Sequence, residues 1–376
     1  MSSLRVAITG GGTGGHIYPA LTIAKTLQSL APGTEVLYIG TREGLEADIV
    51  PRTGLPFEVV HVAGVAGKSL TRAASGVLQA GRGTLESLRL LRRWRPDVVV
   101  GTGGYVSGPV VLAGRLAGAR VAIQEQNAIP GFTIRVLSRL AQRVFLPNQS
   151  AREFFPRDAK FQVTGNPVRP EVLAVDRDEA RLRLGVPADR RLLYVFGGSR
   201  GARAINQALV PVLGRLLQRP DLMVLYVTGK AAYDDVAGQV QRQGIDLEIP
   251  GKIMVKPYLY EAEDALAAAD LALVRAGAMT MAEVAVRGLP AVIIPFPYAI
   301  YDHQERNARV PERQGAAVVI REQSLTPEGL EETIAGLLDH PGRLAEMARK
   351  MKELGRPDAA ERIARGVLAL AAKGGN

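Results

Sequence analysis

The sequence predicts an α/β protein of two domains, each built on a mainly parallel sheet. Short apolar runs rich in Val, Ile and Leu alternate with helical patterns from end to end, which is typical of parallel sheets covered by helices. Three of these runs lead directly into clusters of glycine. The length of 376 residues exceeds what one hydrophobic core usually organises, which favours two domains.

The first half of the chain contains seven predicted strands with helices between them. The strands are predicted near residues 4–9, 35–39, 57–62, 97–100, 121–124, 143–146 and 161–163. The helices are predicted near residues 18–30, 44–52, 75–93, 107–117 and 132–141.

The second half repeats the alternation of strands and helices. A turn-rich connection, GNPVRP at residues 165–170, separates the two series. From about residue 327 the chain is predicted to be helical, with breaks at 341–342 and 355–357, and Asp358 is a candidate cap for the last helix. The strands of this half are predicted near residues 192–196, 223–228, 253–256, 271–274, 291–294 and 317–320.

The three glycine clusters cover residues 10–16, 101–109 and 197–202. A buried parallel strand that ends in glycines and leads into a helix presents several backbone N–H groups at the positive end of that helix, where a phosphate binds. Two clusters lie in the first half and one in the second. This distribution predicts two phosphate-handling surfaces that face each other, one on each domain.

The composition narrows the class of protein. The absence of cysteine excludes disulfides and thiolate metal sites. The chain enters its first strand directly, and its longest apolar stretch, residues 289–300, contains three prolines. We therefore expect neither a signal peptide nor a membrane-spanning helix. The net charge of +10 makes nucleic acid and an anionic membrane both candidate partners.

Basic residues concentrate in the segment 64–95, where Glu86 is the single acid. Leucines at 78, 85, 88 and 91 alternate with the arginines, as in an amphipathic helix that lies on anionic lipid. The same pattern also fits leucines that face the sheet and arginines that face solvent. The basic residues of the segment are Lys68, Arg72, Arg82, Arg89, Arg92, Arg93 and Arg95.

Three other nucleotide or metal motifs fit the sequence poorly. The first glycine cluster has the spacing of a dinucleotide site, but the second strand ends in Ile39-Gly-Thr-Arg without the acid that binds ribose. The GKS at 67–69 lacks the first glycine of a Walker loop, because Val62 occupies that position. The Asp-x-Asp at 176–178 is explained better as a charged helix start than as a metal site.

Several longer motifs follow one another along the chain. They are GGTGGH at 11–16 followed by Pro19, GGYVSGP at 103–109, EQN at 125–127, GNPVR at 165–169, GGS at 197–199, GAR at 201–203, and Arg275, Gly277, Ala278, Thr280 and Glu283. In sequence and order these motifs resemble the MurG family of bacterial glycosyltransferases, and the resemblance runs from about residue 4 to 370.

This resemblance implies the GT-B fold, with two Rossmann-like domains around a cleft and a last helix that crosses back to the first domain. The implied acceptor and membrane domain is residues 1–164 with 357–376, and the UDP-sugar domain is residues 165–356. The implied reaction is inverting transfer of N-acetylglucosamine from UDP-GlcNAc to the C4 hydroxyl of the MurNAc of lipid I, which gives lipid II and UDP for peptidoglycan.

The resemblance also implies the partners. These are UDP-GlcNAc, polyprenyl-linked lipid I and an anionic membrane surface, with no nucleic acid, no cofactor and no metal. The implied location is peripheral, on the cytoplasmic face of the cell membrane.

Donor contacts are implied mainly in the second half. Ser199 and the helix after it would bind the diphosphate, although a plain strand-to-helix turn is an alternative. Glu283 would accept both ribose hydroxyls, unless it only caps its helix. The backbone of Leu259 would read the uracil, unless this is a core leucine. The other implied substrate contacts are Asn127, Arg169 (otherwise a hinge ion pair), Ala278, Met279, Thr280, Met281, Ala282 and Gln304.

Catalysis requires a base that takes the proton of the attacking MurNAc hydroxyl. His16 is the favoured candidate because an imidazole titrates near neutral pH. Alternatively, His16 binds a phosphate or fixes its loop. Glu125 is the second candidate base, unless its role is structural. The resemblance implies that Thr13, Gly14 and Gly15 line the cleft near the acceptor diphosphate and the donor sugar, and that Gly104 and Tyr105 belong to the acceptor side.

Five positions depart from patterns common in the family. Gln124 stands where many members have histidine, and Ile134 replaces a polar residue, which favours His16 as the base. The donor-side departures, which leave backbone contacts available, are Arg200, Ala276 and His303.

Two other classes of function remain open. A different GT-B nucleotide-sugar enzyme, such as a glycolipid glycosyltransferase or a UDP-GlcNAc epimerase, is the nearest alternative; an epimerase would lack a lipid-docking surface. A basic nucleic-acid-binding protein would show steeply salt-dependent binding and would give the glycine clusters no role.

Overall fold

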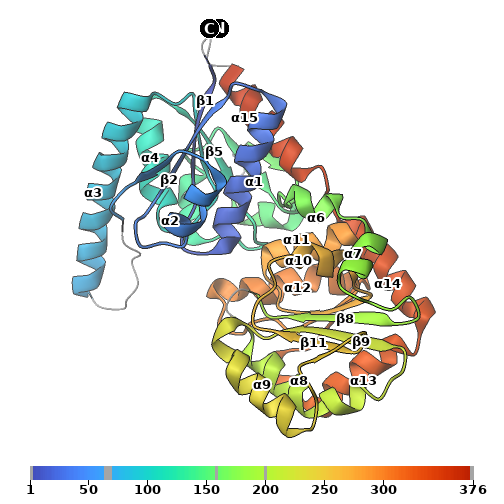
Figure 1. Ribbon diagram of the computed structural model, residues 1–376. Coiled ribbons are helices and arrows are strands. Elements are labelled where there is room, and N and C mark those ends of the chain that lie inside the picture. Colours follow the sequence, from blue (N-terminus) through green and yellow to red (C-terminus); the bar gives the residue numbers. More distant parts are fainter. Residues whose placement is uncertain (1–2, 63–69, 157–159, 199–200, 373–376) are drawn as a thin grey trace. The chain divides into compact units, whose positions relative to one another are not determined.

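The computed structural model describes residues 3–62, 70–156, 160–198 and 201–372, with backbone only for 70–79 and 300. The chain divides into two compact units, Met1–Arg169 with Pro357–Asn376, and Pro170–Arg356. In each unit, helices cover both faces of a single sheet (Figure 1).

The sheet of the first unit has seven strands in the order β3-β2-β1-β4-β5-β6-β7, and every pair is parallel. Its central strands are apolar and fully buried because helices cover both of their faces, as expected for parallel pairing. The strands are β1 (Arg5–Thr9), β2 (Glu35–Gly40), β3 (Phe57–Val59), β4 (Val98–Gly101), β5 (Arg120–Gln124), β6 (Arg143–Leu146) and β7 (Phe161–Val163).

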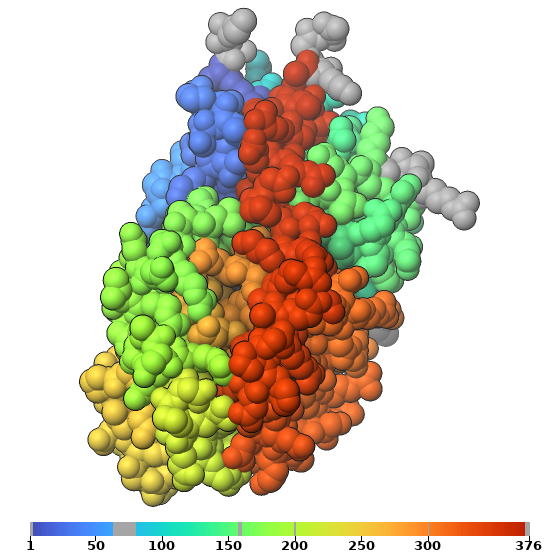
Figure 2. Space-filling view, turned by 90° about the vertical axis from the view of Figure 1, so that its right-hand side faces the viewer, coloured from blue at the N-terminus to red at the C-terminus, as the bar shows by residue number. Residues whose placement is uncertain are grey.

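The last helix of the chain belongs to the first unit. It lies beside α1, so a helix from near each end of the sequence lies on the same face of this sheet (Figures 1 and 2). Gly366 allows the close approach, because a Cβ there would lie 2.6 Å from the buried ring of Phe145. The helices are α1 (Gly14–Leu30), α2 (Glu46–Ile49), α3 (Leu70–Trp94), α4 (Ser107–Leu116), α5 (Phe132–Leu137) and α15 (Ala359–Ala372), with short turns η1 (Pro51–Thr53) and η2 (Gln149–Phe154).

The sheet of the second unit has the order β10-β11-β9-β8-β12-β13-β14. All of its pairs are parallel except that of β10 with β11. The strands are β8 (Arg191–Phe196), β9 (Leu222–Val227), β10 (Glu248–Ile249), β11 (Ile253–Lys256), β12 (Leu271–Val274), β13 (Ala291–Ile293) and β14 (Ala317–Val319).

Helices of the second unit begin with α6 (Pro170–Ala174) and α7 (Arg177–Arg183). Asp176 caps α7 by accepting from the backbone N–H groups of Asp178 at 2.9 Å and Glu179 at 3.1 Å, which confirms the helix-start interpretation of this acidic pair. The remaining helices are α8 (Arg203–Leu216), α9 (Tyr233–Arg242), α10 (Ala262–Ala268), α11 (Ala278–Arg287), α12 (His303–Arg313), α13 (Pro327–Leu338) and α14 (Pro341–Leu354), with turns η3 (Lys230–Ala232), η4 (Ile300–Asp302) and η5 (Glu322–Ser324).

The structure contains every strand predicted from the sequence and adds one. The additional strand, β10, has two residues and pairs antiparallel at the sheet edge, where it is too short to produce a periodic pattern. The helix predicted at 44–52 is shorter, as α2 and η1, and the one predicted at 132–141 ends at Leu137. Among the helices of the described residues, none combines the length and apolar character needed to cross a membrane.

Candidate functional site

Each sheet reverses its winding direction between two neighbouring strands. In the first unit these strands are β1 and β4, and in the second they are β8 and β12. In open α/β sheets, ligands bind at the carboxyl edge where the loops after two such strands diverge. All three glycine clusters follow one of these four strands. The topology therefore places a ligand site at the three glycine loops that the sequence also indicates. It adds a fourth loop, residues 275–277, which follows β12.

The two glycine loops of the first unit interlock. Gly11 N donates to Gly103 O at 3.3 Å, and Thr102 Oγ1 donates to the carbonyl of His16 at 2.8 Å. Gly104 approaches so closely that a Cβ there would lie 2.2 Å from Gly11 O, and its φ of +82° is a left-handed conformation. Only glycine satisfies both conditions, so this residue type is required for loop contact and not only for phosphate access.

A fully buried carboxylate, Glu46 in α2, fastens this loop pair. It accepts from Gly12 N at 3.0 Å, from Thr41 N at 3.1 Å and from Thr41 Oγ1 at 2.7 Å. The same Thr41 hydroxyl lies 3.0 Å from the hydroxyl of Tyr105. Glu46 thus links the loops after β1, β2 and β4. The sequence does not reveal this role of Glu46, because a single acid in a short helical pattern is typical of a surface residue.

The predicted acceptor residues Thr13, Gly14 and Gly15 lie at the start of α1. Thr13 is the N-cap, and its side chain makes no capping bond to the helix. The N–H groups of the first turn of a helix carry partial positive charge, so this end suits an anionic group. Arg169, at the end of the first unit, lies over the ring of Tyr18 with its guanidinium carbon 5.8 Å from the ring centre.

His16 is partly exposed in the first turn of α1, with one ring edge against the protein. Its Nδ1 lies 3.1 Å from the carbonyl oxygen of Thr102 and 3.0 Å from Oε1 of Gln126. The imidazole is therefore held between the loops after β1, β4 and β5. This geometry fits a base with a fixed ring as well as a residue that fixes its loop.

Glu125, the second candidate base, is buried and bonded to its own loop. Its carboxylate accepts from Asn127 N at 2.7 Å, Asn127 Nδ2 at 3.1 Å and Gly131 N at 3.3 Å. Burial raises the pKa of Glu125 from 4.5 to about 7, although hydrogen bonds from Asn127, Gln126 and Gly131 partly oppose the rise. These contacts favour a structural role in which Glu125 orients Asn127.

The two departures near this site have buried side chains. Gln124 donates through Nε2 to the carbonyl of Glu125 at 2.9 Å and to Asn166 Oδ1 at 3.1 Å. Ile134 packs in the apolar core between the sheet and its helices. Neither side chain contains a group that titrates near neutral pH.

In the second unit, α11 offers the clearest anion site. Its N-cap is Gly277, whose lack of a side chain leaves capping to other groups, and no acid occupies its first turn. The predicted donor residues 278–283 are all partly exposed, whereas Val284 to Val286 are buried. The predicted substrate contacts thus occupy the accessible start of the helix and its packed end lies in the core.

The other donor predictions lie around the same sheet edge. Gly197 and Gly198 directly follow the strand β8, whereas Ser199 and Arg200 lie outside the described residues. Leu259 is partly buried between the exposed Tyr258 and Tyr260, so it is not a fully buried core residue.

Gln304 and Arg275 order the loop that follows β13. Gln304 accepts from Phe296 N at 3.0 Å through its side-chain oxygen. The buried Arg275 donates to the carbonyls of Ile294 and Pro295, both at 3.1 Å, and its Nη2 lies 2.6 Å from a carboxylate oxygen of Glu322.

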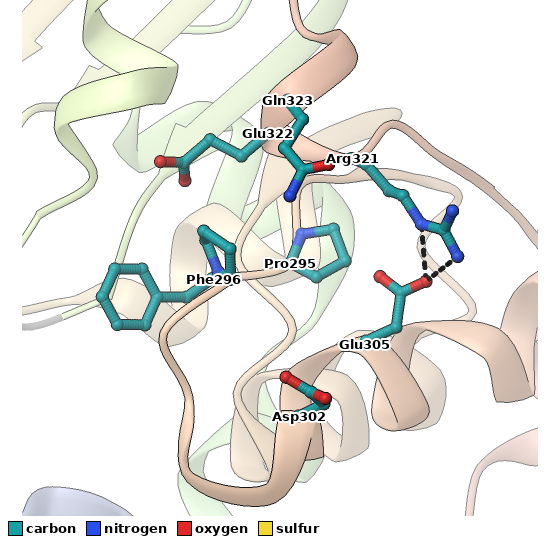
Figure 3. A pocket seen from close by; sticks show the side chains of 8 residues that line it. Pro295, Phe296, Asp302, Glu305, Arg321, Glu322 and Gln323 are labelled. Atoms are coloured by element: carbon teal, nitrogen blue, oxygen red, sulfur yellow. Dashed lines mark hydrogen bonds and ion pairs between the residues drawn. The ribbon is translucent and has the colours of Figure 1, made fainter.

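A pocket of about 230 Å³ lies beside this loop (Figure 3). Arg321 crosses one side of it and bonds Glu305, with Nε 3.0 Å from Oε1. Three carboxylates and one arginine line the pocket, so its net negative charge disfavours binding of a diphosphate there. The lining residues are Pro295, Phe296, Pro297, Asp302, Glu305, Arg321, Glu322 and Gln323.

The structure corrects part of the predicted membrane helix. Leu91 is fully buried and Leu88 packs against the core, so these two leucines face the protein, whereas Leu85 is 56% exposed. Glu86 accepts from Arg82 Nε at 2.9 Å and from His61 N at 2.9 Å. The arginines at 82, 89, 92 and 93 are exposed, while Lys68 and the side chains of Arg72 and Leu78 lie outside the described residues.

Comparison with known proteins identifies the family. Residues 6–146 match the glycosyltransferase family 28 N-terminal domain, and residues 192–363 match the C-terminal domain of the same family. A Desulforudis audaxviator protein named UDP-N-acetylglucosamine–N-acetylmuramyl-(pentapeptide) pyrophosphoryl-undecaprenol N-acetylglucosamine transferase is 48% identical over 99% of this chain and 100% of its own length. The crystal structure of Acinetobacter baumannii MurG has a TM-score of 0.76 at 30% identity and covers 97% of this chain and 99% of that one. The chain belongs to the MurG family.

Other relatives agree with this assignment. A Moorella thermoacetica protein with the same transferase name is 49% identical over 97% of this chain and 98% of its own length. Similarity to a MurG structure over nearly the whole chain confirms the GT-B fold that the resemblance implied. Within the described part of the chain, no three His, Asp or Glu side chains gather in a group that could hold a metal ion.

Replacing Glu125 by glutamine is expected to weaken the pH dependence of stability. The folded protein retains a proton on Glu125 that the unfolded chain loses, so stability falls as pH rises from 4.5 to about 7. The contribution lost is on the order of 3 kcal/mol. Thermal unfolding at about pH 5 and about pH 8 should show a smaller loss of Tm for Glu125→Gln than for the parent protein. The exposed Glu153→Gln is the control, and a Glu125→Gln profile parallel to that of the parent contradicts the assignment.

Proposed function

We propose that this chain transfers N-acetylglucosamine from UDP-GlcNAc to the C4 hydroxyl of the MurNAc residue of lipid I, with inversion, to give lipid II and UDP. Membership in the MurG family and the full-length match to the named transferases support this reaction. The observation that carries the proposal is the presence of two complementary switch-point sites. The first unit offers an imidazole beside a glycine-loop helix start, and the second offers a helix start free of acids in its first turn.

The second unit is proposed to hold the donor. The N–H groups of Ala278, Met279 and Thr280 at the start of α11 would bind the diphosphate, where the helix dipole stabilises the charge that develops on the leaving UDP. Glu283, about one turn further, would accept the ribose hydroxyls. The remaining proposed donor contacts are Met281, Ala282, Ser199, Leu259, Gln304, Arg169 and Asn127.

The first unit is proposed to hold the lipid-linked acceptor. Thr13, Gly14 and Gly15 would bind its diphosphate at the start of α1, and Tyr105, held by Thr41, would line the same edge together with Gly104. His16 would take the proton from the attacking hydroxyl. Glu125 would keep Asn127 in place.

The same unit is proposed to dock on an anionic membrane, on the cytoplasmic face of the cell. Helix α4 packs against both α3 and α5, and the three helices expose apolar side chains, including Leu85 at 56%, Leu116 at 58% and Phe132 at 65%. Helix α3 also exposes arginines, and exposed apolar and basic side chains together are typical of a protein that binds at an anionic lipid interface.

Transfer of labelled N-acetylglucosamine to a polyprenyl-diphosphate-linked MurNAc-pentapeptide tests the reaction. The parent protein should label the lipid and release UDP. His16→Ala should lower kcat by about 100-fold or more, because it removes the general base. Glu283→Gln should mainly raise KM for UDP-GlcNAc, by about tenfold, because a charged hydrogen bond to ribose is lost.

His340→Ala, in the second unit, is the control for the histidine variant. Among the contacts described, the ring of His340 makes a hydrogen bond within its own segment, with Nδ1 2.7 Å from the carbonyl oxygen of Gly336. This control variant should keep the parent rate. Conversion of UDP-GlcNAc to an epimer, or transfer to a soluble sugar with no label in the lipid, would overturn the proposed acceptor.

Charge reversal on α3 tests membrane docking. The triple variant Arg89→Glu, Arg92→Glu and Arg93→Glu should bind vesicles of anionic phospholipid about 100-fold more weakly than the parent, because each cation near the surface contributes about 1 kcal/mol. Sedimentation with vesicles measures the partition. A matched triple reversal of exposed arginines in the second unit, at 242, 313 and 343, should bind like the parent. Equal loss in both triples would refute docking through α3.

A further inference from the structure

The buried side chain of Gln126 contacts the ring of His16, and the proposed function gives Gln126 no role. It is 3% exposed and lies in the loop after β5. Its amide reaches three partners on one side and His16 on the other. The pattern of these contacts fixes both the orientation of the amide and the position of the imidazole proton.

The orientation of the Gln126 amide follows from its partners. Three oxygens lie within hydrogen-bond distance of Nε2 and share its two N–H groups: the carbonyl of Thr102 at 2.7 Å, the carbonyl of Gln124 at 3.2 Å and Oε1 of Gln124. These three oxygens can only accept, so the reversed amide would place its own oxygen against them. The nitrogen therefore faces this group, and Oε1 faces His16.

The side chain of Gln124 is itself oriented in the same way. Its Nε2 donates to the carbonyl of Glu125 and to Oδ1 of Asn166, which directs its Oε1 toward Gln126. Asn166 in turn donates to the carbonyl of Gln126 at 2.9 Å. The chain of amides is thus consistent from Asn166 to His16.

The position of the imidazole proton follows next. Nδ1 of His16 lies 3.0 Å from Gln126 Oε1 and 3.1 Å from the carbonyl oxygen of Thr102. Both are acceptors, so Nδ1 must carry a proton, and in the neutral ring the basic lone pair is on Nε2. Gly103 closes off this side of the ring, because a Cβ there would lie 2.7 Å from Nδ1.

We propose that Gln126 is a positioning residue that, with the carbonyl of Thr102, holds His16 as the Nδ1–H tautomer and directs Nε2 to the reaction. This inference rests on the proposed function. The proton of the MurNAc 4-hydroxyl passes to Nε2 as its oxygen bonds to the anomeric carbon. The bond from that carbon to the UDP oxygen breaks, and its electron pair leaves with UDP. The two acceptors at Nδ1 then stabilise the imidazolium.

The first test needs no transferase activity. The full chain contains four histidines, so ¹⁵N-labelled protein gives a small set of imidazole signals, and His16→Gln identifies the signal of His16. At a pH where this ring is neutral, the proton should reside on Nδ1. A ring with its proton on Nε2 overturns the proposal. A protein that lacks transferase activity but shows the Nδ1–H form refutes only the proposed function.

The second test is Gln126→Met, which keeps the side-chain length and removes the acceptor. We expect kcat to fall about 10- to 100-fold with KM for UDP-GlcNAc unchanged, as for other residues that orient a reacting group through a hydrogen bond. The His16 signals should show a larger share of the Nε2–H form.

Gln142→Met is the matched control. Its Oε1 accepts from Val121 N at 2.7 Å in the same unit, so this variant also loses a glutamine acceptor from a structural hydrogen bond. It should keep the parent kcat and the parent His16 signals. Parent-like kcat in Gln126→Met, or a fall in kcat with unchanged His16 signals, overturns the proposal.

Discussion

The backbone of the loop after β4 lies directly against the backbone of the loop after β1, and the first unit's site depends on this contact. Gly104 and Gly11 approach so closely that no side chain fits between them. The carbonyl of Thr102 and the ring of His16 meet as a result, because they lie on the same two loops. Glu46 fastens the pair from α2. The glycines of this site therefore bring protein groups together as well as leaving room for a ligand.

The two units use the same topological principle with different chemistry. In both, a loop at the point where the winding reverses leads into a helix that receives no capping bond from the side chain of its N-cap residue: α1, capped by Thr13, and α11, capped by Gly277. The first unit adds, at this point, a buried network of amides beside an imidazole. In the proposed function, the second unit would bind and stabilise the leaving anion, whereas the first would activate the nucleophile.

The sequence predicts those features that depend on local pattern. Apolar runs predict the long strands, and glycine clusters predict the loops where the winding direction of the sheet reverses. Both features are visible in the sequence because each consists of neighbouring residues. The sequence does not predict Glu46 or the orientation of Gln126, since their roles arise only when loops far apart in the chain meet. Leu91 is an example of a local pattern that misleads. Its spacing along the helix fits a stripe that faces lipid, but the packing of α3 on α4 buries its side chain in the protein.

The most direct measurement compares the transfer rate of Gly104→Ala with that of Gly118→Ala. Both residues have a left-handed φ, +82° and +89°, but an alanine Cβ meets Gly11 O at 2.2 Å in the first and nothing within 4 Å in the second. If loop contact positions His16, kcat should fall about 100-fold in Gly104→Ala alone, since a displacement near 1 Å has this effect, with UDP-GlcNAc binding kept. Equal kcat in the two variants would contradict the account.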